Sequence, residues 1–233
     1  MIWAVLQVPI LGAPFQFLTT WAHELGHGLG ALLTGGGFEH LEIMPDLSGL
    51  AQTLVSGDKQ YSIVILGGLM GPTIAGALML ILTRGFNLYR LALTIIFIGL
   101  VATLVFWSGS LFTSSSVAIA AMVIGAIVLR GPDALAFLAA HFIAISFCLN
   151  AVAGFDYFFM SRANVGGSTH RSDIGTLSEI MFGSQMLWAI GLAVSSLIVL
   201  AAAFMFSNAL ARRSQRIAQE KRVAKKAEKQ LSQ

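Results

Sequence analysis

The stretch "TTWAHELGHGLGALLTGGG" (Thr19–Gly37) places two histidines and a glutamate inside an otherwise apolar run. His23, Glu24 and His27 have the spacing His-Glu-x-x-His. On a helix, positions i and i+4 differ by about 40° in direction and about 6 Å in rise, so both imidazoles lie on one face and can bind one ion. Glu24 is turned by about 100° from His23. It can instead take a proton from a water on that ion.

Zinc is the metal that this motif predicts, because two imidazoles, one carboxylate and an open position describe a catalytic zinc site. In a soluble helix the same motif can occur by chance with all three residues solvated. Ionisable residues in an apolar span are costly and usually functional, which weakens that interpretation here. Two others stay open: hydrogen bonds between helices, and a path for protons or ions.

The composition sets the motif in a membrane protein. Of 233 residues, 56% are hydrophobic and 11% are charged, against roughly 25% charged in soluble domains. Apolar stretches of about 20 residues recur, and each can cross a hydrocarbon core of roughly 30 Å. The single cysteine, Cys148, excludes an intramolecular disulfide and a multi-cysteine metal site. We expect an all-α polytopic membrane protein with six spans, within Ile2–Leu33 and at Tyr61–Leu82, Leu91–Trp107, Leu111–Leu129, Ala134–Phe155 and Met186–Phe206.

Two connections between spans carry structure of their own. After the first span, "FEHLEIM" (Phe38–Met44) alternates and "GLAQTLV" (Gly49–Val55) can return as a second strand, which predicts a small β-hairpin. Before the last span, Asn164–Ser168 is expected to be flexible and Asp173–Met181 to be helical.

Small residues predict close contact between the first two spans. Gly67, Gly71 and Ala75 have the four-residue spacing that lets two membrane helices approach closely. Glycines also flank the histidine motif in the first span. We therefore expect these two spans to pack tightly and to fix the imidazoles.

Positive charge predicts the orientation of the spans. Arg84, Arg90 and Arg130 fall on one side together with the C-terminal tail, so that side should be cytoplasmic. The hairpin and the connection at residues 156–185 fall on the opposite side. The membrane that fits best is the inner membrane of a bacterium.

The C-terminal tail holds most of the positive charge. Residues 212–229 have eight Lys/Arg and two Glu, whereas the rest of the chain has six Lys/Arg and nine Asp/Glu. We divide the chain into a membrane-embedded domain at residues 1–206 and a basic, helical tail at residues 207–233. Beside a span, such a tail is attracted to anionic lipid. This attraction explains the tail without nucleic acid as a partner.

Three segments resemble one family. "AHELGHGLGALLTGGG" looks like the active-site helix of the site-2 protease-like membrane zinc metallopeptidases. "ILGGLMGPTIAGALM" (Ile65–Met79) is similar to the glycine-rich second helix of their compact bacterial members, and "RSDIGTLSEIMFGSQMLWAIGL" resembles their segment before the last span. The similarity runs in order along most of Trp21–Ala203. It implies a zinc metallopeptidase that cleaves membrane proteins in or near the bilayer, with Glu24 as the base.

The resemblance also implies a third zinc ligand, which is an aspartate. In well-studied relatives it lies in an Asn-Pro-Asp-Gly or Leu-Asp-Gly context, and this sequence has neither. Asp173, in "HRSDIG", matches by segment and is predicted to lie on the same side as the histidine motif. Asp156, in "NAVAGFDYFF", is the alternative.

Two other functions stay open beside the peptidase. The chain could be a non-catalytic membrane protein that keeps the peptidase fold, or a transporter or channel that uses His23, Glu24 and His27 as an ion path. The intact Glu24 argues against the first. The near absence of charged residues from the other spans argues against the second. The predicted hairpin could bind an unwound substrate by β-augmentation or act as a lid.

Overall fold

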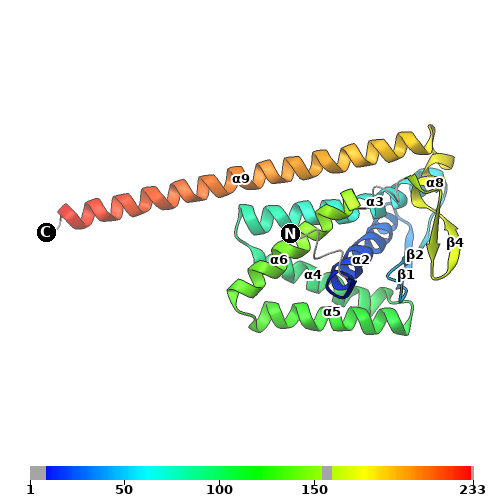
Figure 1. Ribbon diagram of the computed structural model, residues 1–233, viewed down its shortest axis with the longest axis horizontal. Coiled ribbons are helices and arrows are strands. Elements are labelled where there is room, and N and C mark those ends of the chain that lie inside the picture. Colours follow the sequence, from blue (N-terminus) through cyan, green and yellow to red (C-terminus); the bar gives the residue numbers. More distant parts are fainter. Residues whose placement is uncertain (1–8, 154–158, 232–233) are drawn as a thin grey trace.

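The computed structural model describes residues 9–153 and 159–231 and is mostly helical (Figure 1). Two small antiparallel hairpins interrupt the helices. In chain order, the elements are α2 (Pro9–Leu33), β1 (Gly37–Ile43), β2 (Gly49–Leu54), α3 (Asp58–Leu80) with a π-helical end η1 (Ile81–Gly85), α4 (Tyr89–Ala102) with a π-helical end η2 (Thr103–Trp107), α5 (Leu111–Arg130), α6 (Asp133–Ala153), β3 (Arg162–Val165), β4 (Ser168–Arg171), α8 (Asp173–Ile180) and α9 (Gln185–Leu231).

The protein is a polytopic membrane protein, as its composition predicts. Within the described residues, four helical stretches are long and apolar enough to cross a membrane, and they match the second, third, fourth and sixth predicted spans. α6 counts only as a shorter apolar helix, and α2, which carries the polar motif, is not among the four. By length and composition, the described residues thus contain four of the six expected spans. The four stretches are Asp58–Gly85, Tyr89–Trp107, Leu111–Arg130 and Gln185–Lys221.

The backbones of α2 and α3 touch through their glycines. A Cβ added to Gly26 would lie 2.3 Å from the Gly67 carbonyl oxygen, and one added to Gly67 would lie 2.5 Å from the Gly26 carbonyl oxygen. Only glycine permits such an approach, because any side chain would collide with the opposite backbone. The predicted tight packing of these two helices is confirmed.

The first hairpin is confirmed, and its strand β1 is anchored to the helical body. The Ile43 amide donates to the Thr113 hydroxyl over 2.9 Å, and that hydroxyl lies 3.3 Å from the Ile43 carbonyl. The Gly109 amide donates to the Leu41 carbonyl over 3.0 Å. Since β1 has the body on one side and β2 on the other, β2 is the outer strand of this hairpin.

The second hairpin, β3–β4, lies where the sequence predicts a flexible segment. Val165 pairs with Ser168, and the two residues between them, Gly166 and Gly167, have φ angles of +56° and +81°. A type I′ hairpin turn needs positive φ at both central residues, which glycine adopts readily. The glycine pair therefore forms an ordered turn. Its Gly166 amide donates to the Ser48 hydroxyl in the turn of the first hairpin, over 3.1 Å.

The two ends of the helical body differ. The connections from α3 to α4 and from α5 to α6 lie at one end, whereas both hairpins and the start of α9 lie at the other (Figure 1). α9 then runs along the body and extends well past it without a break. Its 47 residues correspond to about 70 Å of helix at about 1.5 Å per residue. The last span and the basic tail thus form one helix, and a domain boundary at residue 206 stays a prediction.

Candidate metal centre

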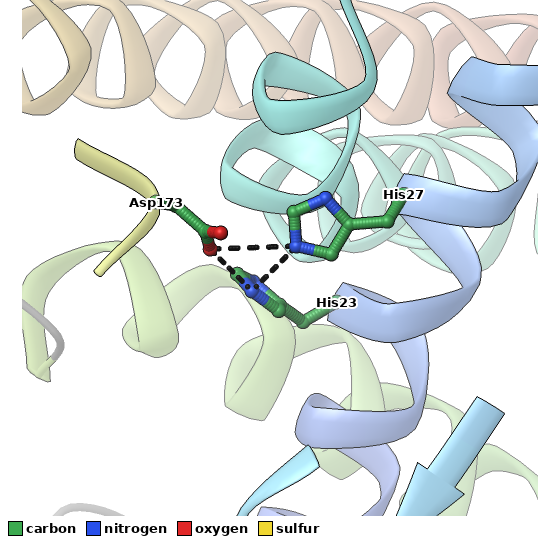
Figure 2. A group of neighbouring side chains, drawn as sticks. All are labelled: His23, His27 and Asp173. Carbon is green, nitrogen blue, oxygen red and sulfur yellow. Dashed lines mark hydrogen bonds and ion pairs between the residues drawn. The ribbon is translucent and has the colours of Figure 1, made fainter. Parts of the chain in front are cut away.

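Two side chains of α2 and one of α8 converge at the hairpin end of the body (Figure 2). Nε2 of His23 lies 3.0 Å from Oδ2 of Asp173, and Nε2 of His27 lies 3.3 Å from the same oxygen. The two Nε2 atoms are 3.1 Å apart. One ligand atom from each of the three residues therefore points at a common position.

This triangle has the dimensions of a zinc site. Zinc binds imidazole nitrogen and carboxylate oxygen at about 2.0–2.1 Å, so two ligand atoms at tetrahedral angles are about 3.3 Å apart. The three edges of the observed triangle are 3.0, 3.3 and 3.1 Å. Two imidazoles and one carboxylate are also a donor set that zinc prefers. The residues present fit this ion.

His27 is held by α3 as well as by its own helix. Its Nδ1 lies 2.9 Å from the Val64 carbonyl oxygen, and because a carbonyl can only accept, Nδ1 carries the proton and Nε2 keeps a lone pair for a metal. A Cβ added to Gly68 would lie 2.2 Å from the imidazole ring, so the absence of a side chain there makes room for the ring. The residue is 8% exposed. These contacts fix the ring in a ligand orientation.

Asp173 enters the site at the first turn of α8. The preceding Ser172 caps this helix, because its hydroxyl accepts from the Gly175 amide over 3.1 Å. Ile174 and Leu177 are fully buried and belong to a cluster with side chains of α3 and α9, which seats the short helix. Burial opposes ionisation of Asp173, but attraction to the two histidines holds the pKa of its carboxyl below the ordinary value.

Glu24 is buried beside the triangle but is not part of it. The residue is 5% exposed, and the group that could hold a metal ion within the described residues comprises His23, His27 and Asp173 only. Its carboxylate lies against β2: a Cβ added to Gly49 would be 2.5 Å from Oε1 of Glu24. The backbone of Ala51 interacts with the same carboxylate. Glu24 therefore faces the hairpin, whereas His27 faces α3.

A cavity of about 540 Å³ connects these four residues. β2 forms one wall, α3 forms another, and the β3–β4 hairpin and α8 complete the enclosure. Several lining residues were not predicted from the sequence, among them Tyr61, Val165 and Arg171. Tyr61 lies seven residues before Gly68, and this spacing places both residues on one face of a helix. The sequence could therefore have suggested that Tyr61 lies on the cavity side of α3. The β3–β4 residues have no comparable signal.

Two further histidines and one aspartate remain to be placed. His40 is paired with Glu42, with 3.9 Å between Nε2 and Oε1, and Nδ1 of His141 donates to the Phe137 carbonyl over 2.9 Å. Neither belongs to the group that could hold a metal ion. Asp156, the alternative third ligand, lies outside the described residues. Of the two aspartates considered as third ligand, Asp173 therefore lies beside the histidines.

Comparison with known proteins identifies the family. No curated protein and no solved structure matches the chain. The family model described as Peptidase M50B-like matches residues 1–203, which include every element up to the middle of α9. This match confirms the resemblance noted in the sequence: the chain belongs to the Peptidase M50B-like family, a site-2 protease family.

Proposed function

We propose that this protein is an intramembrane zinc metallopeptidase that hydrolyses peptide bonds of membrane-protein substrates in or near the bilayer. Its family consists of membrane metallopeptidases in general. The observation that carries the finer proposal is the triangle of His23, His27 and Asp173, with ligand atoms 3.0–3.3 Å apart, beside the buried Glu24. In this proposal the three residues hold zinc and Glu24 is the general base.

The chemistry follows from these roles. When bound, zinc acts as a Lewis acid that lowers the pKa of water to about 7 and polarises a carbonyl. Glu24 takes one proton from the attacking water, whose oxygen forms a bond to the carbonyl carbon of the substrate. Glu24 then gives that proton to the amide nitrogen as the C–N bond breaks. Contact with Gly49 keeps its carboxylate beside the cavity in which the substrate would lie.

The outer edge of β2 supports binding of an extended substrate. The carbonyl of Leu41 and the amide of Ile43 both bond to the helical body and therefore point away from β2. In an antiparallel pair, directly opposite residues point their backbone groups either toward each other or both outward. Ala51 lies opposite Leu41, and Gly49 lies opposite Ile43. The amides and carbonyls of these two β2 residues thus point away from β1.

This outward edge lies in the cavity wall next to Glu24. A peptide bond in a transmembrane helix is shielded by the hydrogen bonds of the helix, so cleavage requires local unwinding. An unwound segment could add to β2 as a further strand, with main-chain hydrogen bonds to Gly49 and to the carbonyl of Ala51, whose amide donates to Glu24. The edge geometry favours this β-augmentation over a lid as the role of the first hairpin.

We further propose that the C-terminal tail lies in the cytoplasm of a bacterium whose inner membrane holds the protein. Arg84 and Arg130 lie in the last turns of η1 and α5, which end opposite the hairpins, and α9 extends past that same end of the body (Figure 1). Positive charge concentrates on the cytoplasmic side of membrane proteins. Anionic lipid is the expected partner of the basic residues near the membrane.

The test combines zinc content and cleavage in detergent-purified protein supplied with zinc. We expect Glu24→Gln to retain zinc and to lower cleavage of a single-span membrane protein by at least about 100-fold, because the base is lost. Asp173→Ala should lose zinc, whereas Asp156→Ala should retain it. Unchanged cleavage in Glu24→Gln would contradict the proposed base. Zinc in the wild type without cleavage of any membrane protein tested would favour a non-catalytic member, and absence of zinc would favour an ion path.

A further inference from the structure

Besides the base and the Lewis acid, a hydrogen-bond donor can assist hydrolysis of a peptide bond. When water adds to the carbonyl carbon, the carbonyl oxygen gains negative charge, and a hydrogen-bond donor placed at that oxygen lowers the barrier. Glu24 cannot serve as this donor while it accepts a proton. The inference below therefore rests on the proposed function and asks which residue of the cavity provides the donor.

Tyr61 lies in the first turn of α3 and lines the cavity together with Glu24 and the three proposed ligands. It is 38% exposed and is close enough to Asp173 to interact with it electrostatically. A tyrosine hydroxyl stays protonated at neutral pH, so it can donate a hydrogen bond without carrying charge. Tyr61 thus offers a neutral donor near the proposed ligands.

The same face of α3 that fixes His27 also carries Tyr61. Tyr61, Val64 and Gly68 have the spacing i, i+3 and i+7, which places them on one side of a helix. The Val64 carbonyl accepts from His27, and Gly68 contacts the His27 ring. Glu24, in contrast, contacts β2. The base and Tyr61 therefore belong to different walls of the cavity, which suits a donor and a base that act on the same carbonyl group.

The other donors among the described lining residues fit this role less well. The Thr176 hydroxyl donates to the Ser172 carbonyl over 3.0 Å, and Arg171 is paired with Glu179. Gln52 and Thr53 belong to β2, the strand that contacts Glu24. His170 lines the cavity from the exposed strand β4 and is the remaining rival.

We propose that Tyr61 is a further catalytic residue, whose hydroxyl donates a hydrogen bond to the oxygen of the scissile carbonyl while water adds to its carbon. The proton stays on the tyrosine throughout. The bond strengthens as the electron pair of the C=O double bond moves onto oxygen, and it weakens when the double bond re-forms and the amine leaves. Tyr61 therefore stabilises the transition state more than the bound substrate.

The first test compares Tyr61→Phe with Tyr89→Phe. Tyr89 begins α4 and packs edge-on against Phe137, and it is not among the residues that line the cavity. Removal of one such donor lowers kcat by about 10²–10³-fold in other enzymes. We expect a decrease of that size in Tyr61→Phe, with KM, zinc content and thermal unfolding unchanged, and no decrease in Tyr89→Phe. Wild-type kcat in Tyr61→Phe, or a comparable loss in His170→Ala instead, would overturn the assignment.

A second readout does not depend on turnover. A peptide phosphonate built on the cleaved sequence carries a tetrahedral group with oxygens where the charged carbonyl oxygen would form. We expect its Kd to rise at least about tenfold in zinc-loaded Tyr61→Phe, and to stay unchanged in Tyr89→Phe. Equal affinity in wild type and Tyr61→Phe would overturn the role of Tyr61. In that event the loss of cleavage in Glu24→Gln would still support the peptidase, so the two proposals fail separately.

Discussion

The α2–α3 pair and the short helix α8 hold the residues of the candidate metal centre in contrasting ways. His23 and His27 lie on a 25-residue helix whose backbone touches that of α3 through glycines. Asp173 lies on an eight-residue helix that reaches the site through two buried side chains and one cap. The histidines are therefore positioned by extensive backbone contact, whereas the aspartate is positioned by a few side-chain contacts.

This contrast indicates which substitutions would displace the histidines of the α2–α3 half and which would displace Asp173 of the α8 half. In the α2–α3 half, the glycines leave no free space, so any added atom must displace a ring or a backbone. In the α8 half, loss of a contact leaves the helix present but less well seated. An added side-chain atom at the α2–α3 contact should therefore lower zinc affinity most. Loss of a packing contact or of the helix cap should lower zinc affinity through α8.

The largest effect is expected from Gly68→Ala in the α2–α3 half. The added methyl group would lie 2.2 Å from the His27 ring, which must then move away from its ligand position. Since loss of the contacts that orient a ligand costs 10–100-fold in metal affinity, we expect a decrease of about 100-fold in zinc affinity, measured by competition with a chelator. Gly191→Ala is the matched control, because a Cβ there would meet no atom within 4 Å. Unchanged zinc affinity in Gly68→Ala would mean that α2 and α3 can separate.

A smaller effect is expected from Leu177→Ala in the α8 half. This side chain is fully buried, and replacement of a buried leucine by alanine costs about 2–5 kcal/mol. Only part of that cost falls on the position of Asp173, so we expect roughly a tenfold decrease in zinc affinity. Leu197→Ala, at a position that is 55% exposed on α9, makes the same change without loss of packing. Equal effects of the two variants would show that α8 is not seated by Leu177.

The smallest effect is expected from Ser172→Ala, which removes the cap of α8. Loss of such a cap costs about 1 kcal/mol, which corresponds to roughly a fivefold decrease in zinc affinity if the whole cost reaches Asp173. Ser115→Ala serves as control, because the Ser115 hydroxyl donates only to a carbonyl of its own exposed helix, over 2.8 Å. A decrease as large as that of Gly68→Ala would contradict the proposed difference between the halves.

Prediction from sequence succeeded where a property depends on neighbours in the chain. The membrane class follows from composition, and the common face of His23 and His27 follows from their spacing. The first hairpin follows from alternation between Phe38 and Val55. The family was identified from short segments and is confirmed by the match over residues 1–203.

Prediction was weaker where a property depends on distant contacts. Six spans were expected, and four helices among the described residues meet the requirements of length and composition. α2 is not among them because its polar residues lower its hydropathy, although tertiary packing buries Thr19, Glu24 and His27. Asn164–Ser168 was expected to be flexible and instead includes the turn of the β3–β4 hairpin, because two adjacent glycines suggest flexibility as readily as a tight turn. The position of Tyr61 on the cavity wall had no signal apart from its helical spacing to Gly68.

The sequence by itself determined that this is a membrane protein with two histidines able to bind one metal ion, since helix geometry alone brings residues four apart to one face. Only the tertiary structure decided which described aspartate meets that pair. Asp173 is 150 residues from His23 in the chain. Its approach depends on the packing of α8 against α3 and α9, an arrangement that no local pattern encodes.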